Sequence, residues 1–205
     1  KEENLDAIFI GGDIVHSKTQ GISPELIDIL VWWFKELSKI ARVHVISGNH
    51  DGLILNKDRQ DAITPIIQAL NDDNILLYKD SERYQDPDHE DINWCVFSCF
   101  DEESWDKVQP DPDKINIALF HGPVLGSKVD SDWEIDEANQ ITTENFKKFD
   151  FTFLGDIHKF QYLDDRKTIA YPGATIQQNY GEDIEKGFLV WDIKDKSNFD
   201  SKFIK

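Results

Sequence analysis

Residues 43–51, VHVISGNHD, constrain the fold of this chain more than any other stretch. The first four residues form an apolar run, which predicts a short buried strand. A serine and a glycine then allow the backbone to turn sharply. An amide, an imidazole and a carboxylate follow at once, at Asn49, His50 and Asp51. Such side chains are costly to place at the end of a buried strand, and that edge of an open α/β sheet is where ligands bind.

Three further apolar runs end in the same way. They lie within residues 6–16 (DAIFIGGDIVH), 115–123 (INIALFHGP) and 151–158 (FTFLGDIH), and each ends in a glycine beside polar side chains. One such ending is weak evidence, whereas four in order are strong. Together they predict that five polar residues meet at one edge of the sheet: Asp13, Asn49, His121, Asp156 and His158.

These five residues are candidate ligands for two divalent metal ions. Two such ions can activate a water and neutralise a phosphoryl group during in-line displacement. The pair needs a bridging carboxylate, for which Asp13 is the candidate. We expect Asn49 and His121 to complete one site with Asp13, and His158 to belong to the other. Mixed oxygen and nitrogen ligands suit Mn²⁺ or Fe²⁺ better than a closed structural zinc site, with Mg²⁺ and Zn²⁺ as alternatives.

His50 directly follows a candidate ligand but should point elsewhere. We therefore assign it to protonating or stabilising the leaving oxygen, a general-acid role. Asp51 has two equally weighted interpretations, since it could orient His50 or cap the following turn. His44 lies inside the strand between two valines and is expected to be structural.

The ordered series Gly-Asp-x-x-His, Gly-Asn-His-Asp, His-Gly and Gly-x-x-His resembles the calcineurin-like metallophosphoesterase superfamily. Within it, the chain is most similar to nuclease subunits of SbcCD-type double-strand-break repair complexes and to phage recombination endonucleases. Residues 12–18 (GDIVHSK) favour that branch, as do residues 170–174 (AYPGA) leading into 180–182 (YGE) and 186–188 (KGF). The resemblance runs from about residue 6 to residue 193.

The resemblance implies a metallophosphoesterase-type α/β sandwich of layered sheets flanked by helices. It implies the same ligand assignments, and it points to Mn²⁺. In the resembled nucleases the position of His16 lies near the phosphate, so His16 is a candidate catalytic helper. Lys18 could touch a phosphate, although a solvated lysine is the default expectation. The implied activity is that of a DNA exonuclease or endonuclease working with an SbcC-like ATPase subunit. A homodimer is left open.

The chain departs from the family pattern in two places. The family begins with an Asp-x-His motif upstream of Asp13, and Asp6 is followed two residues later by Ile8 instead. The chain starts at Lys1 and has no methionine, so we expect a trimmed chain that is incomplete at the N-terminus. The second departure is Asp156, which stands where the family usually has the first His of Gly-His-x-His. An aspartate can also ligate a divalent cation.

Charge weighs against a simple DNA-binding domain. Lys and Arg number 22 against 40 Asp and Glu, a net charge of −18, whereas affinity for the DNA backbone comes largely from basic residues. If DNA is the substrate, a basic partner or a further segment should hold it. The alternatives are a phosphoesterase acting on a small nucleotide or a phosphoprotein, and a degenerate domain without catalysis.

We expect one α/β domain over residues 1–193 and a peripheral polar tail over 194–205. A helix should run from Ser23-Pro24 to about Ile40, squeezed between the sheet and another layer; the less favoured alternative is that Trp32 or Trp33 meets a partner. The other expected elements are strands at 6–12, 42–47, 75–78, 94–100, 115–120 and 151–154, a closing antiparallel set at 160–163, 168–171 and 187–193, short helices at 64–70 and 142–149, and loops at 81–91, 101–114 and 122–140.

The remaining signals concern location. Cys95 and Cys99 lie four residues apart in an apolar strand, which favours core thiols in a reducing compartment over a disulfide or a metal pair. No apolar run approaches the length needed to span a membrane, and no signal peptide is visible. We therefore expect a cytoplasmic protein.

Overall fold

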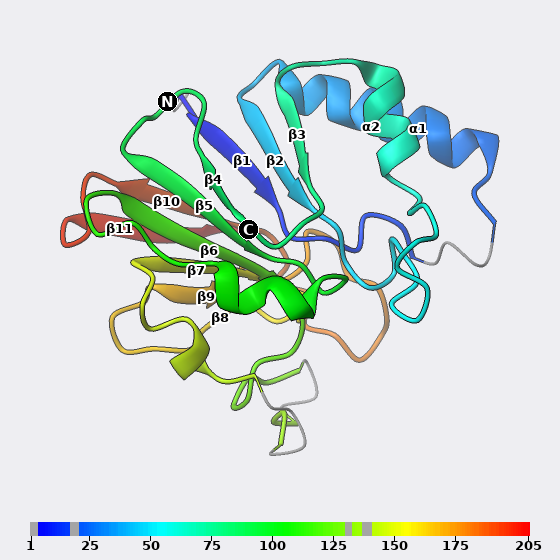
Figure 1. The fold of residues 1–205 in the computed structure, drawn as a ribbon. Coiled ribbons are helices and arrows are strands. Elements are labelled where there is room, and N and C mark those ends of the chain that lie inside the picture. The colour runs from blue at the N-terminus through cyan, green and yellow to red at the C-terminus, as the bar shows by residue number, and fades with distance from the viewer. Residues whose placement is uncertain (1–3, 17–20, 130–132, 137–140) are drawn as a thin grey trace.

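The computed structural model describes residues 4–16, 21–129, 133–136 and 141–205 (Figure 1). Within these residues it confirms the expected α/β sandwich, built from three sheets flanked by short helices. The helices are α1 (Pro24–Ser38) and α2 (Thr64–Leu70), with 3₁₀ helices at Glu102–Lys107 and Thr143–Asn145. The strands are β1 (Ala7–Ile10), β2 (Arg42–Ile46), β3 (Ile75–Tyr78), β4 (Arg83–Gln85), β5 (Ile92–Phe97), β6 (Ile115–His121), β7 (Phe151–Gly155), β8 (Gln161–Tyr162), β9 (Ile169–Tyr171), β10 (Phe188–Ile193) and β11 (Phe199–Ile204).

The first sheet has the order β1-β2-β3, with all three strands parallel. Figure 1 shows α1 and α2 on the side of this sheet away from β5 and β6. Ser23 begins α1, because its hydroxyl accepts a hydrogen bond from the Leu26 amide and Pro24 follows it. Buried apolar residues join both helices to the sheet, among them Leu30, Phe34, Val43, Val45, Ile63, Ile66 and Ile75.

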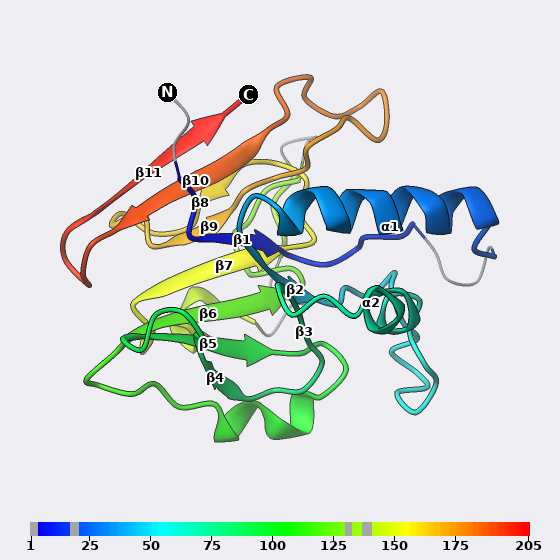
Figure 2. The ribbon, with the colours of Figure 1, turned by 90° about the horizontal axis from the view of Figure 1, so that it is seen from above.

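The second sheet has the order β4-β5-β6-β7-β9-β8. Its four central strands are parallel, and β4 and β8 run antiparallel at its edges. Figure 2 shows β1, β5 and β6 pointing toward the same side of the molecule, so their carboxyl ends share one edge. One core lies between the two sheets and includes Ile46, Tyr78, Trp94, Val96, Leu119 and Phe151. Another covers the outer face of the larger sheet and includes Phe97, Phe120, Val124, Phe146 and Phe149.

The structure shifts several expected boundaries. The predicted loop at 81–91 contains β4, whose charged and polar residues stand at the edge of the sheet. The strand predicted at 94–100 is β5, which begins at Ile92 and ends at Phe97. Only Thr143–Asn145 of the helix predicted at 142–149 is helical, and as a single 3₁₀ turn. These errors all occur where short elements carry too few residues for a clear period.

The prediction of a peripheral polar tail at 194–205 is wrong, because this segment contains β11. This strand pairs antiparallel with β10 along its whole length. Its inward-facing residues alternate with exposed Asp200 and Lys202. Phe199 packs edge-on against Phe151 of the larger sheet. The pair β10-β11 is a separate two-stranded sheet, so β10 does not close the larger sheet as predicted. The charged residues concealed a period-two strand pattern.

The sequence predicts a second layer covering the outer face of α1, but side chains on this face are exposed. Trp32 is 61% exposed and Ile29 is 59% exposed, and no other part of the described chain buries them. Trp33 is half-buried and packs against the core beneath the helix. The alternative, a partner at this face, stays a prediction.

Phe34 gives a test of this helix-sheet core. It is fully buried, so Phe34→Ala should lower the free energy of unfolding by about 3–5 kcal/mol through lost burial and a residual cavity. Trp32→Ala on the exposed face of the same helix should cost less than about 1 kcal/mol. Denaturant unfolding of both variants measures the difference. Equal losses would contradict the assigned orientation of α1.

Candidate metal centre

Glycines allow three strand ends to meet. Gly12 follows β1 with a φ of +92°, and a Cβ there would lie 2.6 Å from both the Gly48 amide nitrogen and His121 Nδ1. A Cβ on Gly48 would overlap Asp13 Oδ1. A side chain at either position would therefore force apart the loops that follow β1 and β2. Their close approach brings Asp13 against the end of β6.

His121 is the centre of the cluster. Its Nδ1 lies 2.6 Å from the Gly11 carbonyl oxygen, so Nδ1 carries a proton and donates it. Its Nε2 faces three oxygens, at 3.0 Å from Asn49 Oδ1, 3.3 Å from Asp13 Oδ1 and 3.7 Å from Asp156 Oδ1. The structure thus brings together four of the five predicted ligands.

This arrangement fits a divalent cation. The ligand atoms of Asp13, His121 and Asp156 lie within 4.8 Å of one another, with His121 buried. Two carboxylates and an amide oxygen around one ring nitrogen need a positive charge between them, either a proton or a metal ion. With a metal bound, the same oxygens and the Nε2 lone pair would all be ligands. The set is the mixed oxygen and nitrogen type that Mn²⁺ and Fe²⁺ accept.

The pKa values express the same need for positive charge. Burial lowers the pKa of His121, but the hydrogen bond and charge of Asp13 outweigh this and raise it overall. Burial raises the pKa of Asp13, and His121 and the His50 amide reverse that effect, so the net shift is downward. Burial raises the pKa of Asp156, with the nearby Asp13 carboxylate acting in the same direction. The shifts therefore favour a protonated His121 beside an ionised Asp13, which places positive charge where a cation would sit.

The backbone at Asp156 is strained. Its φ is +95°, a conformation that glycine adopts readily and that costs other residues about 1–3 kcal/mol. Asp13 also has a positive φ, of +54°. Such strain persists where the surroundings enforce it, and it is concentrated at functional sites. Here it turns both carboxylates toward His121.

His50 and His16 stand beside this cluster. The His50 amide donates to Asp13 Oδ1 at 2.9 Å, and its ring Nδ1 donates to the His16 carbonyl oxygen. Since a carbonyl can only accept, Nδ1 holds the proton and Nε2 is left for another partner. The two imidazole rings lie 5.6 Å apart between centroids, and both residues are exposed. His50 thus follows the candidate ligand Asn49, and its ring contacts the backbone of His16.

Sequence comparison agrees with this geometry. Residues 1–160 match the calcineurin-like phosphoesterase family. The chain belongs to that family. It is also 42% identical, over 207 aligned residues and 95% of its length, to uncharacterized protein R555 of Acanthamoeba polyphaga mimivirus. The chain spans only 15% of that relative.

Membership of the calcineurin-like phosphoesterase family implies a phosphoester hydrolase that binds divalent metals. The cluster around His121 is the candidate metal site of this phosphoesterase domain. No described helix has the length and apolarity to cross a bilayer, since α1 has only 15 residues.

Asp51 caps the turn of the phosphoesterase Gly-Asn-His-Asp motif. Its two carboxylate oxygens accept from the Gly48 amide at 2.8 Å and from the Val15 amide at 3.0 Å. It is fully buried, and burial raises its pKa to about 6 against the opposing effect of these two hydrogen bonds. Both donors precede Asp51 in the chain, so these contacts match neither the orientation of His50 nor a cap on the turn that follows Asp51. Asp51 also ties the loop after β1 to the loop after β2.

His158 lies outside the three-residue cluster, and Lys18 lies outside the described residues. His158 Nδ1 is 2.9 Å from Glu182 Oε1, in the loop between β9 and β10. Burial raises the pKa of Glu182, but hydrogen bonds from the Gln178 amide, His158 and Lys186 lower it to about 2. The sequence marks the segment YGE by family resemblance but predicts no role for its acid.

The structure also tests the predictions for His44 and for the two cysteines. His44 is fully buried, with Nδ1 2.9 Å from the Tyr78 hydroxyl and Nε2 3.5 Å from Asp86, so its structural role is confirmed. Cys95 and Cys99 are both buried free thiols, and burial raises the pKa of each to about 12. Neither thiol is suited to bind a metal near neutral pH.

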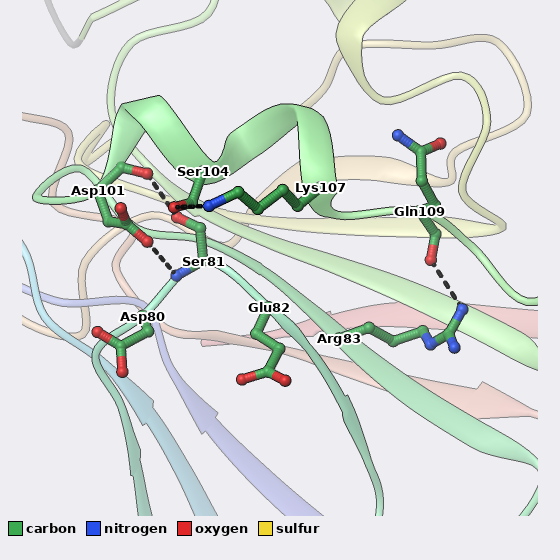
Figure 3. A pocket seen from close by; sticks show the side chains of 8 residues that line it. All are labelled: Asp80, Ser81, Glu82, Arg83, Asp101, Ser104, Lys107 and Gln109. Carbon is green, nitrogen blue, oxygen red and sulfur yellow. Dashed lines mark hydrogen bonds between the residues drawn. The ribbon is translucent and has the colours of Figure 1, made fainter.

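A polar depression lies beside β4 (Figure 3). Its groups pair with one another: the Ser81 amide donates to Asp101 at 2.9 Å, and Arg83 donates to the Gln109 carbonyl at 3.1 Å. It contains none of the predicted ligands. The lining residues are Asp80, Ser81, Glu82, Arg83, Asp101, Ser104, Lys107 and Gln109.

Gly48→Ala tests the assembly of the metal centre. The new Cβ would overlap Asp13 and lie 2.6 Å from His121 Cε1, so both ligands must move. We expect Mn²⁺ affinity, measured by calorimetric titration, to fall about 10- to 100-fold or more. Gly21→Ala is the matched control, because its Cβ would meet nothing within 4 Å at an exposed position, so only its backbone conformation, with a φ of +84°, is tested. Unchanged affinity in Gly48→Ala would contradict the site.

Proposed function

We propose that this chain is the catalytic part of a metal-dependent DNA phosphodiesterase, an exonuclease or endonuclease in double-strand-break repair or recombination. The observation that carries the proposal is the exposed ring of His50, held beside the four candidate ligands, with no partner for its Nε2 among the described residues. A proton donor next to a metal centre is the pair of functions that phosphoester cleavage requires. The segments AYPGA, YGE and KGF support the nuclease branch.

In this proposal, different residues hold the metal ions, donate the proton and bind the phosphate. Two divalent ions, Mn²⁺ in our proposal, would activate water and neutralise the phosphoryl oxygens. Asp13, Asn49, His121 and Asp156 would hold one ion, and His158 would contribute to the other with ligands from a further segment. In its doubly protonated form, His50 would give the Nε2 proton to the leaving oxygen and become neutral, while Nδ1–H stays bonded to the His16 carbonyl. The ring of His16 would steady the phosphate.

DNA binding needs help from elsewhere. With a net charge of −18, this chain alone would repel the phosphate backbone. We propose that an SbcC-like ATPase subunit, or other parts of a larger protein, supply the basic surface. A homodimer is a second arrangement that would bring two centres together. A reducing, cytoplasmic location accords with the two free thiols.

The second candidate is a phosphoesterase acting on a small nucleotide or a phosphoprotein. The acidic charge favours it, because a small substrate does not need an extended basic surface. A degenerate domain that binds one metal without catalysis is the third.

Hydrolysis assays on the full-length protein separate these candidates. With Mn²⁺ added and a chelator control, linear double-stranded DNA is compared with a simple phosphate monoester. Chelator-sensitive DNA cleavage with little monoester activity is the expected result. Monoester hydrolysis with intact DNA would move the chain to the small-substrate class, and inactivity toward both would favour the degenerate domain.

His50→Ala separates catalysis from metal binding. Turnover should fall about 10²- to 10⁴-fold, because the leaving oxygen loses its proton donor. Mn²⁺ affinity should stay near the wild-type value, since His50 is not among the proposed ligands.

His89→Ala is the matched control, because His89 belongs to the connection between β4 and β5, away from the proposed ligands. It should leave both turnover and metal affinity unchanged. Loss of Mn²⁺ binding in His50→Ala would show that His50 is a ligand instead of the acid.

A further inference from the structure

We propose that Glu182 is a positioning residue that, together with Lys186, locks the His158 ring with Nδ1 protonated and Nε2 free to bind a metal ion. This inference rests on the proposed metal-dependent function. It assigns a role to the segments YGE and KGF, which the catalytic scheme leaves unused.

The carboxylate of Glu182 has all its acceptor directions filled. Oε1 accepts from His158 Nδ1 at 2.9 Å and from Asn179 Nδ2 at 2.8 Å. Oε2 accepts from the Gln178 amide at 3.0 Å and lies 3.1 Å from Lys186 Nζ. A carboxylate offers about four lone-pair sites, so Glu182 has none left for a metal. Its role is therefore to hold His158 and not to be a ligand.

The burial of this ion pair is unusual for its surroundings. The side chains of Glu182 and Lys186 are 3% and 6% exposed, whereas every other residue of 175–185 is exposed. Burying two charges costs free energy that their attraction only partly offsets, so such a pair in an exposed loop needs a reason. Lys186 Nζ also donates to the His158 carbonyl at 3.0 Å. Glu182 thus contacts the ring of His158, and Lys186 contacts its backbone carbonyl.

The tautomer follows from the acceptor. A carboxylate can only accept, so the proton of a neutral His158 ring stays on Nδ1 and the Nε2 lone pair is exposed. Metal-binding histidines commonly use a carboxylate in this way, which fixes the ring and raises its basicity as a ligand. His158 is the one predicted ligand outside the His121 cluster, and Glu182 is what orients it.

The first experiment measures the His158 ring by nitrogen-15 NMR in the metal-free protein above pH 8. Wild type should show Nδ1–H alone. In Glu182→Gln, the amide can turn its NH₂ toward the ring, so a share of Nε2–H should appear. Glu185→Gln is the matched control, an exposed acid of the same loop paired with Lys205. A wild-type tautomer preserved in folded Glu182→Gln would overturn the proposal.

The second experiment titrates Zn²⁺ and follows the nitrogen-15 shift of His158 Nε2, which reports this site alone. Affinity at Nε2 should fall about 10- to 100-fold in Glu182→Gln and stay unchanged in Glu185→Gln. If Glu182→Gln does not fold, Glu182→Asp retracts the carboxylate by one methylene and should shift both readouts in the same direction. Unchanged affinity at Nε2 in a folded variant would overturn the role.

The two experiments also separate this inference from the proposed function. If wild type binds no metal at any site, the proposed function fails, while the tautomer measurement still tests Glu182. If metal binds at the His121 cluster but the His158 tautomer is insensitive to Glu182, only this inference fails.

Discussion

The close approach of glycine backbones beneath His121 is the constraint on which the site depends. Gly12, Gly48 and Gly155 each leave no room for a Cβ, since His121 or a neighbouring main chain occupies that space. The ends of β1, β2, β6 and β7 can therefore meet at contact distance, although they come from different parts of the chain and from two different sheets. The candidate ligands converge because the backbones of these strand ends approach one another so closely.

Electrostatics explains why such a site is held open for a cation. The oxygens of Asp13, Asn49 and Asp156 surround a ring nitrogen whose other nitrogen is committed to the Gly11 carbonyl. The backbone conformation of Asp156 is costly for a residue other than glycine, so the surrounding structure must hold it in place. A bound divalent ion would stabilise the same arrangement, so metal binding and the local fold should be coupled.

Most of the fold was predictable where an element was long or strongly apolar. The positions of α1, α2, β3 and β6 followed from capping residues and apolar runs. β4 and β11 were missed because they are short or carry charges, and their existence depends on partners distant in sequence. The exposure of Trp32 could not be predicted from the sequence either, because burial depends on which other elements pack against the helix.

The sequence by itself determined the chemistry: which residues could be ligands, that His50 follows one of them, and which family the ordered motifs indicate. Those properties belong to residue types and local spacing. Only the tertiary structure decided which candidate ligands meet and that Asp51 caps a turn. It also decided that Glu182 forms a hydrogen bond with His158, 24 residues away in the chain. Contacts between distant segments depend on how sheets and loops pack, and no local pattern encodes that geometry.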